Sequence, residues 1–441
     1  MDYTPHTDED VAAMLDTIGV SSIEDLFEPI PSSLRLGRRL ELGAPVSESE
    51  IYDHLYEMAA MNVATDRLTC FAGGGAYDHY IPAAVRALAG RSEFMTSYTP
   101  YQPELSQGVL GALFDYQTMV CELTGMEAAS SGLYDGAAAI MEAINLSAVA
   151  TGRKKVVVSG AINPNYRRVL KTLGKSQGYT LVTAPAQAGT TVFEDVEDAA
   201  CVVVGQPNFF GCVEDIAAVG ELAHGAGALL IVHFDPLAAG ILQSPGALGA
   251  DVVTGEGQSL GNDLNFGGPY LGIFATRTEH LRRMPGRICG ATVDVHGKPG
   301  FVLTLQTREQ HIRREKATSN VCTDQTLMAV TAAVYLSWLG PQGIQELGRT
   351  CSSLSHYAAH LASELPGCRL RFAAPFIKEF VLEVPGDARA AVSALAGSGY
   401  LVGPSLEAFP GMESCLLIAV TERRTVQQVE QMVKALGQVI A

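Results

Sequence analysis

The stretch from Gly225 to Ala275 reads GAGALLIVHFDPLAAGILQSPGALGADVVTGEGQSLGNDLNFGGPYLGIFA and contains two short apolar runs, each followed by polar groups. The first run, Leu229 to Val232, ends in His233 and Asp235, and the second, Ala250 to Val253, opens into a Gly-rich loop. Continuous apolar runs of this length predict central strands of a parallel sheet. Because ligands of open α/β sheets bind beyond the carboxyl ends of such strands, Asp235 and the loop are expected to face the same space.

Asp235 is the first candidate ligand-binding group. Enzymes of the aminotransferase-like fold place an aspartate at a strand end, against the pyridine nitrogen of pyridoxal phosphate, and a Schiff-base lysine roughly 20 to 30 residues later. Here Lys175 and Lys298 are consecutive lysines, so no lysine follows Asp235 at that distance. The expectation is an aminotransferase-like fold whose own chain does not hold the cofactor covalently.

Ser259 supports a rival function. The segment GQSLG, residues 257–261, matches the G-x-S-x-G nucleophile elbow of the α/β-hydrolases. That elbow needs a helix directly after it, whereas residues 262–269, NDLNFGGP, are turn-forming and lack a helical period. A serine hydrolase that uses Ser259 is therefore the less favoured alternative.

The composition and charge of the chain limit the kinds of partner and the cellular location that can be expected. The chain has 441 residues, of which 47% are hydrophobic and 17% charged, a balance that favours burial between subunits and hence an oligomer. The net charge of -17 argues against nucleic acid as a partner. The nine cysteines are scattered, and the acidic N-terminus does not resemble a signal peptide. The longest apolar stretch is too short to span a bilayer. These features predict a cytoplasmic protein without a membrane partner.

Three regions are expected along the chain. Residues 1–64 predict a helical arm, because Thr7 with Asp10 and Ser47 with Glu50 form capping boxes. Residues 65–342 alternate strand and helix, which predicts a large domain with a mainly parallel sheet. A helix from Thr326 should stop at Gly340-Pro341, and residues 343–441 should form a small α+β domain.

The helix that starts near Gly136 is expected at the phosphate end of such a cofactor site, where free amides and the helix dipole favour an anion. Tyr134 and Asp135 place a ring and a negative charge at that position, and both oppose a phosphate. The crevice formed by Tyr134, Asp135, Asp235 and Ser259 is therefore interpreted as vestigial. A ligand of another kind for this crevice stays an open alternative.

The segment from Ser97 to Gly108, SYTPYQPELSQG, is the best candidate for a polar site wall. Two prolines hold it extended while its side chains offer hydroxyl, amide and carboxylate groups. Packing of its tyrosines against a neighbouring subunit is an equally favoured alternative. The candidate wall residues are Tyr98, Thr99, Tyr101, Gln102 and Glu104.

Arginines gather at Gly286-Arg287 and in residues 306–316, QTREQHIRREK. Such a cluster can clamp a carboxylate, but a solvated helix face or an ion-pair network between subunits is favoured. His311 has no partner at a metal-ligand spacing, so no metal site is expected.

Four segments together resemble the N-terminal half of glycine decarboxylase, the P-protein of the glycine cleavage system. They are SYTPYQPELSQG (97–108), MPGR (284–287), QTREQHIRREK (306–316) and SNVCT (319–323). One form of that enzyme is split into two homologous subunits, and the chain resembles subunit 1, the one that lacks the cofactor lysine. The resemblance implies a large domain of the pyridoxal-phosphate-dependent transferase fold type I.

The resemblance also implies a reaction and its partners. Glycine, joined to pyridoxal phosphate on subunit 2, would lose carbon dioxide and pass its aminomethyl group to the lipoyl arm of H-protein. This chain would complete a heterodimer, in an α2β2 assembly, and its wall segment would reach the partner's pocket. A non-catalytic subunit that only docks H-protein is a further alternative.

Overall fold

The computed structural model describes residues 5–97 and 99–441 and divides into two compact units, Met1–Val63 and Ala64–Ala441. In the first unit, α1 (Asp8–Ile18) and α2 (Glu48–Ala60) start at the predicted capping boxes. Short 3-10 turns η1 (Ile23–Phe27) and η2 (Ser32–Leu34) lie between them. Neither helix has a buried residue, so the predicted arm forms local structure without a core of its own.

The second unit is built on a seven-stranded sheet with the order β2-β10-β9-β8-β7-β3-β4. Strands β4, β3, β7, β8 and β9 are parallel, while β10 and β2 are antiparallel to their neighbours. The two apolar runs form β8 and β9, central strands of the sheet as predicted, and the structure shows that they pair directly, with Val232 opposite Val253. The seven strands are β2 (Ala128–Ala129), β3 (Lys155–Ser159), β4 (Thr180–Ala184), β7 (Ala199–Gln206), β8 (Leu229–Phe234), β9 (Val252–Glu256) and β10 (Gly272–Thr276).

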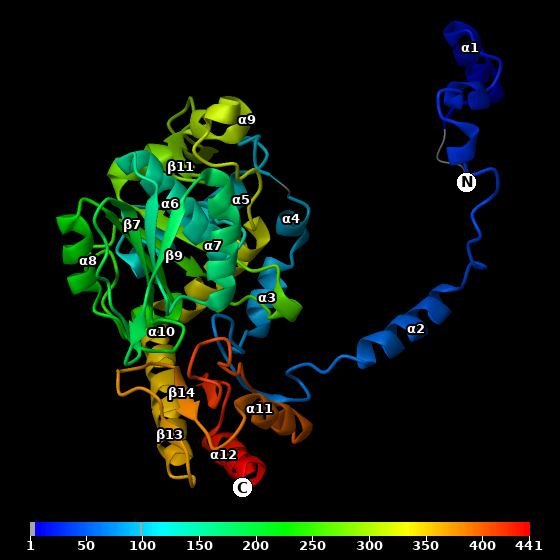
Figure 1. Cartoon of the computed structure of the whole chain (residues 1–441). Coiled ribbons are helices and arrows are strands. Elements are labelled where there is room, and N and C mark those ends of the chain that lie inside the picture. Colours follow the sequence, from blue (N-terminus) through cyan, green and yellow to red (C-terminus); the bar gives the residue numbers. More distant parts are fainter. Residues whose placement is uncertain (1–4, 98) are drawn as a thin grey trace. The chain divides into compact units, whose positions relative to one another are not determined.

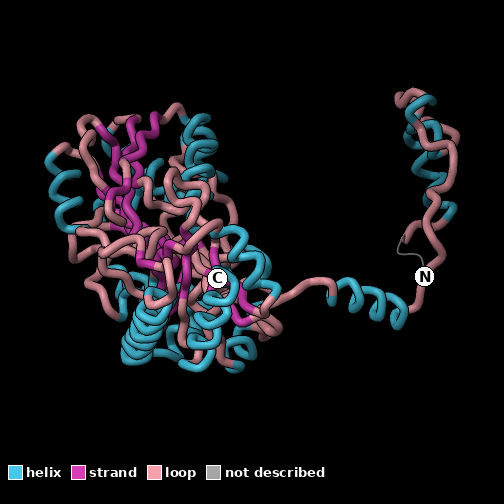
Figure 2. Tube along the Cα trace, turned by 60° about the horizontal axis from the view of Figure 1, so that its bottom comes forward, coloured by secondary structure: helices cyan, strands magenta, loops and turns pink. Residues whose placement is uncertain are grey.

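Helices cover both faces of this sheet, and Figure 2 shows the strands inside them. On one face, α6 (Gly136–Thr151) and α7 (Pro164–Gln177) pack through Ile140, Ile144 and Leu170 against β3, β7 and β8. On the other face, α5 (Gln107–Thr124), α8 (Ile216–Gly225) and α10 (Thr326–Ser363) enclose a second apolar layer. The result is the expected α/β architecture.

Helix α10 runs past the point where the sequence predicted its end. Gly340 has a φ of 63°, so the helix kinks at Gly340-Pro341 and then continues to Ser363. By length and composition α10 could cross a membrane, and it is the one such helix among the described residues. Its side chains Ala329, Ala332 and Tyr335 are buried in the core, as in a core helix.

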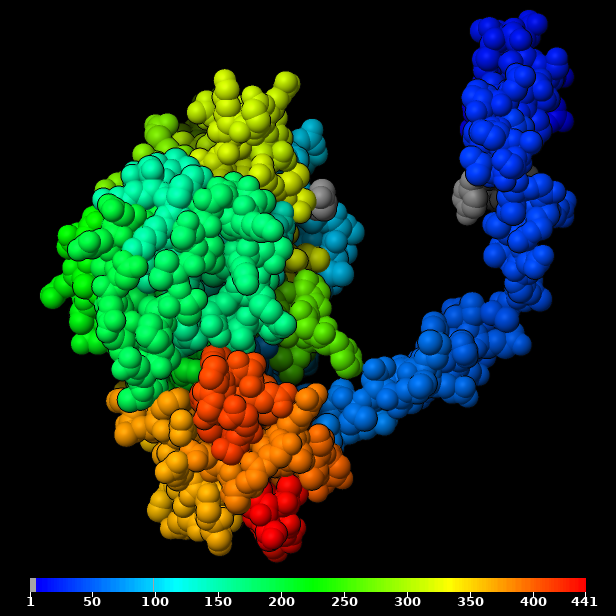
Figure 3. Space-filling view, viewed as in Figure 1, coloured from blue at the N-terminus to red at the C-terminus, as the bar shows by residue number. Residues whose placement is uncertain are grey.

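The C-terminal part forms a second core, and Figure 3 shows its orange residues against the green ones, with the red C-terminal end below. Strands β13 (Arg369–Leu370), β14 (Glu379–Glu383) and β16 (Cys415–Ala419) form an antiparallel sheet beside α11 (Ala388–Gly397) and α12 (Val426–Ile440). Strand β15 (Tyr400–Gly403) pairs in parallel with β1 (Thr69–Ala72). The sequence pattern predicted neither β1 nor β15, so an N-terminal strand joins the C-terminal part. The division at residue 342 stays a prediction.

The remaining elements of the second unit are short, and Figure 1 shows α3, α4 and α9 among them. The helices are α3 (Ala83–Ala89), α4 (Ser92–Met95) and α9 (Gln310–Arg313), with 3-10 turns η3 (Pro236–Gly240), η4 (Asn265–Gly267), η5 (Thr278–Arg283), η6 (Gln306–Arg308) and η7 (Arg314–Lys316). The hairpins are β5 (Ala186–Gln187) with β6 (Thr190–Thr191) and β11 (Cys289–Val293) with β12 (Pro299–Leu303).

Candidate functional site

A crevice lies at the carboxyl ends of β7, β8 and β9, where the sequence placed it. Asp235 and Ser259 line the same cavity, which confirms that the strand end and the loop after β9 face one space. The cavity measures about 60 Å³ and is also lined by Tyr77 and Glu379, which belong to other parts of the chain. A volume of this size admits a few water molecules.

The structure adds a lysine that the sequence argument missed. Lys378 precedes β14, and its Nζ atom lies 2.6 Å from Oδ2 of Asp235. The same atom lies 3.6 Å from the centroid of the Tyr77 ring, a cation–π contact, and the residue is buried. The sequence pattern points only to lysines that follow Asp235 closely, whereas Lys378 reaches Asp235 from a position far along the chain.

Tyr77 and Glu379 form the wall beside Lys378. The Tyr77 hydroxyl donates to Oε1 of Glu379 over 2.7 Å, and the Gly74 amide donates to Oε2 over 3.0 Å. Burial raises the pKa of Glu379 to about 7, although these two hydrogen bonds oppose the shift. Burial also raises the pKa of Tyr77, so its hydroxyl remains a donor near neutrality.

The start of α6 forms the other end of the crevice. Asp135 is the N-cap of this helix and accepts from the Ala138 amide over 2.7 Å. The Gly136 amide donates to Oε2 of Glu256 over 2.9 Å, so a buried carboxyl group of β9 lies at the helix N-terminus. Burial raises the pKa of Glu256 to about 7. Asp135 and Tyr134 line an adjoining cavity of about 450 Å³ rather than the one beside Asp235.

His233 and Ser259 do not form a catalytic pair. Burial lowers the pKa of His233 to about 4, so its imidazole is neutral, and it packs edge to face on Tyr166 with 5.4 Å between ring centroids. Among the described residues, no hydrogen bond joins Ser259 to a histidine, and no helix directly follows its turn. These observations remove the support for the hydrolase alternative.

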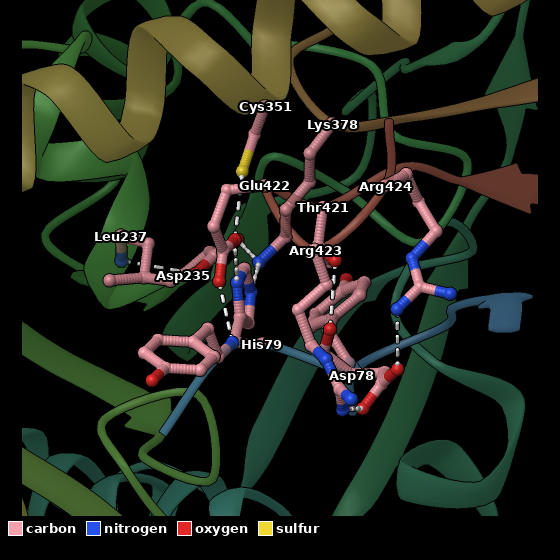
Figure 4. A network of polar contacts seen from close by, with 12 residues as sticks. Asp78, His79, Asp235, Leu237, Cys351, Lys378, Thr421, Glu422, Arg423 and Arg424 are labelled. Carbon is pink, nitrogen blue, oxygen red and sulfur yellow. Dashed lines mark hydrogen bonds and ion pairs between the residues drawn. The ribbon is translucent and has the colours of Figure 1, made fainter. Parts of the chain in front are cut away.

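A buried polar network continues from Lys378 toward the C-terminal part (Figure 4). His79 Nε2 lies 3.5 Å from Lys378 Nζ, while His79 Nδ1 lies 2.7 Å from Oε2 of Glu422. The Cys351 thiol donates to the same carboxylate oxygen over 3.5 Å. Burial acts to raise the pKa of Glu422, but the hydrogen bond and charge of His79, together with backbone hydrogen bonds that include the Tyr80 amide, outweigh burial and lower the pKa to about 2.

Asp78 carries a parallel set of contacts to the same C-terminal loop. Its carboxylate pairs with Arg423 and with Nη2 of Arg424, the latter over 3.0 Å, and its carbonyl accepts from the Thr421 hydroxyl. Residues 77–79 are thus held to the C-terminal part on both sides. His79, Cys351 and Glu422 could also present three metal-ligand atoms, although His79 and Glu422 satisfy each other.

The candidate wall lies apart from this crevice. Thr99, Tyr101, Gln102 and Glu104 do not line the cavity beside Asp235, and Tyr98 lies outside the described residues. Tyr101 is 48% exposed and has its ring 5.6 Å from the Arg287 guanidinium and 6.1 Å from the His311 ring. The wall therefore belongs to a second surface, beside the basic segment, and its role stays a prediction.

The basic cluster divides into two kinds of arginine. Arg287 is buried and pairs with Asp324 over 3.2 Å, and Arg308 donates to the carbonyls of Met284 and Gly286 over 2.6 Å each. These two side chains fix the local backbone, which the sequence argument did not anticipate. Arg313 and Arg314 are exposed, as a solvated face requires.

Comparisons with known proteins agree along the whole chain. The family described as "Glycine cleavage system P-protein" matches residues 1–436. A protein of Desulforamulus reducens named "Probable glycine dehydrogenase (decarboxylating) subunit 1" is 46% identical, and the match covers 99% of both chains. A protein of the same name from Prosthecochloris aestuarii is 47% identical over 99% of both.

A solved structure described as glycine decarboxylase (P-protein) of the glycine cleavage system, in inhibitor-bound form, superposes with a TM-score of 0.91. It is 43% identical, and the match covers 100% of both chains. The fold is that of pyridoxal-phosphate-dependent proteins of fold type I, as expected. With the parallel sheet, the aspartate at the end of β8 and these full-length matches, the chain belongs to the glycine cleavage system P-protein family.

Proposed function

We propose that this chain is subunit 1 of a two-subunit glycine dehydrogenase (decarboxylating). The observation that carries the proposal is identity of 46% over 99% of a relative that bears this name. In the proposed reaction, glycine loses carbon dioxide and its aminomethyl group passes to the lipoyl arm of H-protein. The chain acts as one part of that enzyme and is inactive alone.

Pyridoxal phosphate is assigned in this proposal to the partner, subunit 2. In this chain the carboxylate of Asp235 already pairs with Lys378, and the cavity beside it measures about 60 Å³. Pockets for cofactor-sized ligands measure roughly 300 to 1,000 Å³. The cofactor supplies the electron sink for decarboxylation when bound, and no step of that chemistry is assigned to this chain's crevice.

The contribution assigned to this chain is made at the subunit boundary. Tyr101, Gln102 and Glu104 are exposed around Pro103, where they can meet another chain without disturbing their own core. The backbone forms turns from Gln102 to Ser106 instead of the extended segment that the two prolines predicted. Polar tips held by a stiff backbone can orient a small substrate and exclude water in a neighbouring pocket. We assign Thr99 and Tyr98 to the same wall on the basis of the sequence.

The assembly proposed is a heterodimer that pairs into α2β2. The second unit has an extensive core, whereas the described part of the arm exposes Leu34, Leu42 and Met61, at 76%, 80% and 83%. Apolar surface of this extent is typical of chains that bury it against a partner. The nine cysteines are free, which is in keeping with the cytoplasmic location that we propose.

The decisive experiment is an activity assay with subunit 2 added and withheld. We expect glycine carboxyl exchange in the presence of H-protein only when both subunits are present, and we expect the complex to elute as one species. Exchange by subunit 2 alone at the rate of the complex would reduce this chain to a docking subunit for H-protein. Exchange by this chain alone would contradict the proposal, and cell fractionation tests the location.

A further inference from the structure

We propose that Lys378 and Glu256 take the places which this fold offers to the two charged ends of pyridoxal phosphate. Lys378 replaces the ring nitrogen at Asp235, and Glu256 replaces the phosphate at the start of α6. The chain thereby closes its crevice with its own side chains and holds its two cores together without cofactor. This inference concerns the chain alone and stands whether or not the proposed reaction is correct.

The ring-nitrogen end rests on the geometry at Asp235. In this fold the aspartate at the end of the central strand stabilises a cationic ring nitrogen. Here the cation at that carboxylate is the ammonium of Lys378, at 2.6 Å, stacked on the Tyr77 ring at 3.6 Å. Because Lys378 already neutralises the Asp235 carboxylate, this carboxylate does not need a cationic ligand as a partner.

The phosphate end rests on the geometry at α6. A helix N-terminus attracts anions because its first amides lack partners within the helix. Here the Gly136 amide donates to Glu256 and the Ala138 amide donates to Asp135, so carboxyl oxygens already occupy the acceptor positions. Glu256 also accepts from the amides of Gln258 and Leu271, each over 3.1 Å, which fixes it in that position.

The space beside Asp235 does not fit the cofactor ring. The cavity beside Asp235 measures about 60 Å³, well below the roughly 300 Å³ of the smallest typical ligand pockets. At the start of α6, a Cβ atom on Gly136 would lie 2.8 Å from His233 Cε1 and 3.2 Å from the Tyr166 hydroxyl. Side chains of the chain itself therefore fill the space beside Asp235. In the adjoining cavity of about 450 Å³, the carboxyl groups of Asp135 and Glu256 stand at the start of α6, where a phosphate would lie.

The replacement also joins the two cores. Asp235 follows β8 of the large sheet, whereas Lys378 and Glu379 open β14 of the C-terminal sheet. The Glu379 carboxyl group accepts hydrogen bonds from the Tyr77 hydroxyl and the Gly74 amide, and Lys378 Nζ contacts His79 Nε2. In an enzyme with bound cofactor, ligand contacts can hold such parts together. Here a buried ion pair provides that link permanently.

The first test is a double-mutant cycle on thermal unfolding of the full chain. Lys378→Met and Asp235→Asn each leave one buried charge without its partner, and each should lower the unfolding midpoint by about 5 °C. The double variant should lose clearly less than the sum of the two, because no unpaired charge remains. Lys434→Met, at an exposed lysine of α12, is the control and should leave the midpoint unchanged.

The second test uses free pyridoxal phosphate with the wild-type chain. After equilibrium dialysis we expect less than a tenth of an equivalent retained, and after borohydride reduction we expect no pyridoxyl group on Lys378 in peptide maps. Retention of one equivalent, or reduction of an adduct at Lys378, would overturn the proposal. This test does not depend on whether the variants fold.

The third test addresses the phosphate end with inorganic phosphate. The variant Asp135→Asn/Glu256→Ala keeps an N-cap residue but removes both carboxyl groups from the start of α6. Phosphate should raise its unfolding midpoint by a few degrees and leave that of the wild-type chain unchanged. If phosphate stabilises both proteins equally, or neither, Glu256 does not occupy an anion position. Additive effects in the double-mutant cycle would likewise overturn the role of Lys378.

Discussion

His79 Nδ1 lies 2.7 Å from Oε2 of Glu422, and this contact joins two segments that are 343 positions apart in the sequence. The side chain of His79 is 2% exposed and that of Glu422 17%. The Tyr80 amide donates to the other oxygen of the same carboxylate over 2.6 Å. The segment after β1 is therefore fixed to the loop after β16 by a buried carboxyl group.

We expect His79→Ala to lower the free energy of unfolding by about 3 kcal/mol, because it removes the histidine partner of a largely buried carboxylate and leaves that carboxylate with neutral donors alone. Chemical denaturation of the full chain measures the change. His360→Ala is the matched control, since His360 contacts Glu364 at 3.6 Å on an exposed helix face and should cost no more than about 0.5 kcal/mol. Equal losses in the two variants would contradict the prediction.

Glu379 should make stability depend on pH. Its pKa of about 7 in the folded chain exceeds the ordinary value of 4.5, so the folded state binds the proton more tightly. Its stabilising contribution is complete below about pH 4.5 and is lost as pH rises to about 7, by about 1.4 kcal/mol per pH unit. Glu379→Gln should remove this slope, because the amide does not titrate, while its oxygen can still accept the hydrogen bond from the Tyr77 hydroxyl.

The measurement for Glu379 is the free energy of unfolding of wild type and variant at several pH values between 5 and 8. Glu383→Gln provides the control on the same strand. A hydrogen bond from Arg369 lowers the pKa of Glu383, so its contribution is already complete above about pH 4.5. Its curve should run parallel to that of wild type across this range, and a parallel curve for Glu379→Gln would sink the prediction.

Loss of the wall side chains should reduce turnover without preventing assembly. For Gln102→Ala and Tyr101→Phe we expect normal binding of subunit 2 and glycine carboxyl exchange lowered by up to about a hundredfold, since a misplaced orienting group acts mainly in the transition state. Gln187→Ala, at an exposed glutamine of β5, should leave exchange unchanged. Normal exchange in both wall variants would assign the segment to packing.

A lysine at position 259 should not restore decarboxylation to the chain alone. Ser259→Lys would place a second amine near Asp235, whose carboxylate already pairs with Lys378, and Glu256 and Asp135 would still oppose a phosphate at α6. We expect no exchange above background when the variant is assayed with pyridoxal phosphate and without subunit 2. Measurable turnover would show that the crevice accepts the cofactor after one change.

The sequence predicted the features that depend on neighbours in the chain. The apolar runs of β8 and β9 and the capping boxes at Thr7 and Ser47 are local patterns, so they could be read directly. Lys378 could not be placed in this way, because only tertiary packing brings it to Asp235. A signal was present in Lys378-Glu379 directly before the apolar run FVLEV, since two charges at the start of a buried strand need partners.

Strand β1 was hidden for a related reason. Thr69–Ala72 is short, is followed by three glycines and pairs, among the described strands, with β15 at Tyr400–Gly403. No pattern near residue 70 points to residue 400. The arginines at 287 and 308 were recognised as a cluster, but their acceptors are backbone carbonyls and Asp324, which no side-chain spacing reveals.

The pairing of β1 with β15 has a consequence for synthesis on the ribosome. Between Ala72 and its partner Gly403 lie 403 − 72 = 331 positions, so at roughly 5 to 20 residues per second β1 waits for about 17 to 66 seconds before its partner emerges. During that interval the strand has unpaired amides and carbonyls, and it follows an N-terminal unit whose helices bury no residue. Nascent chains of this protein should therefore need protection by a chaperone until β15, in the last tenth of the polypeptide, has been made.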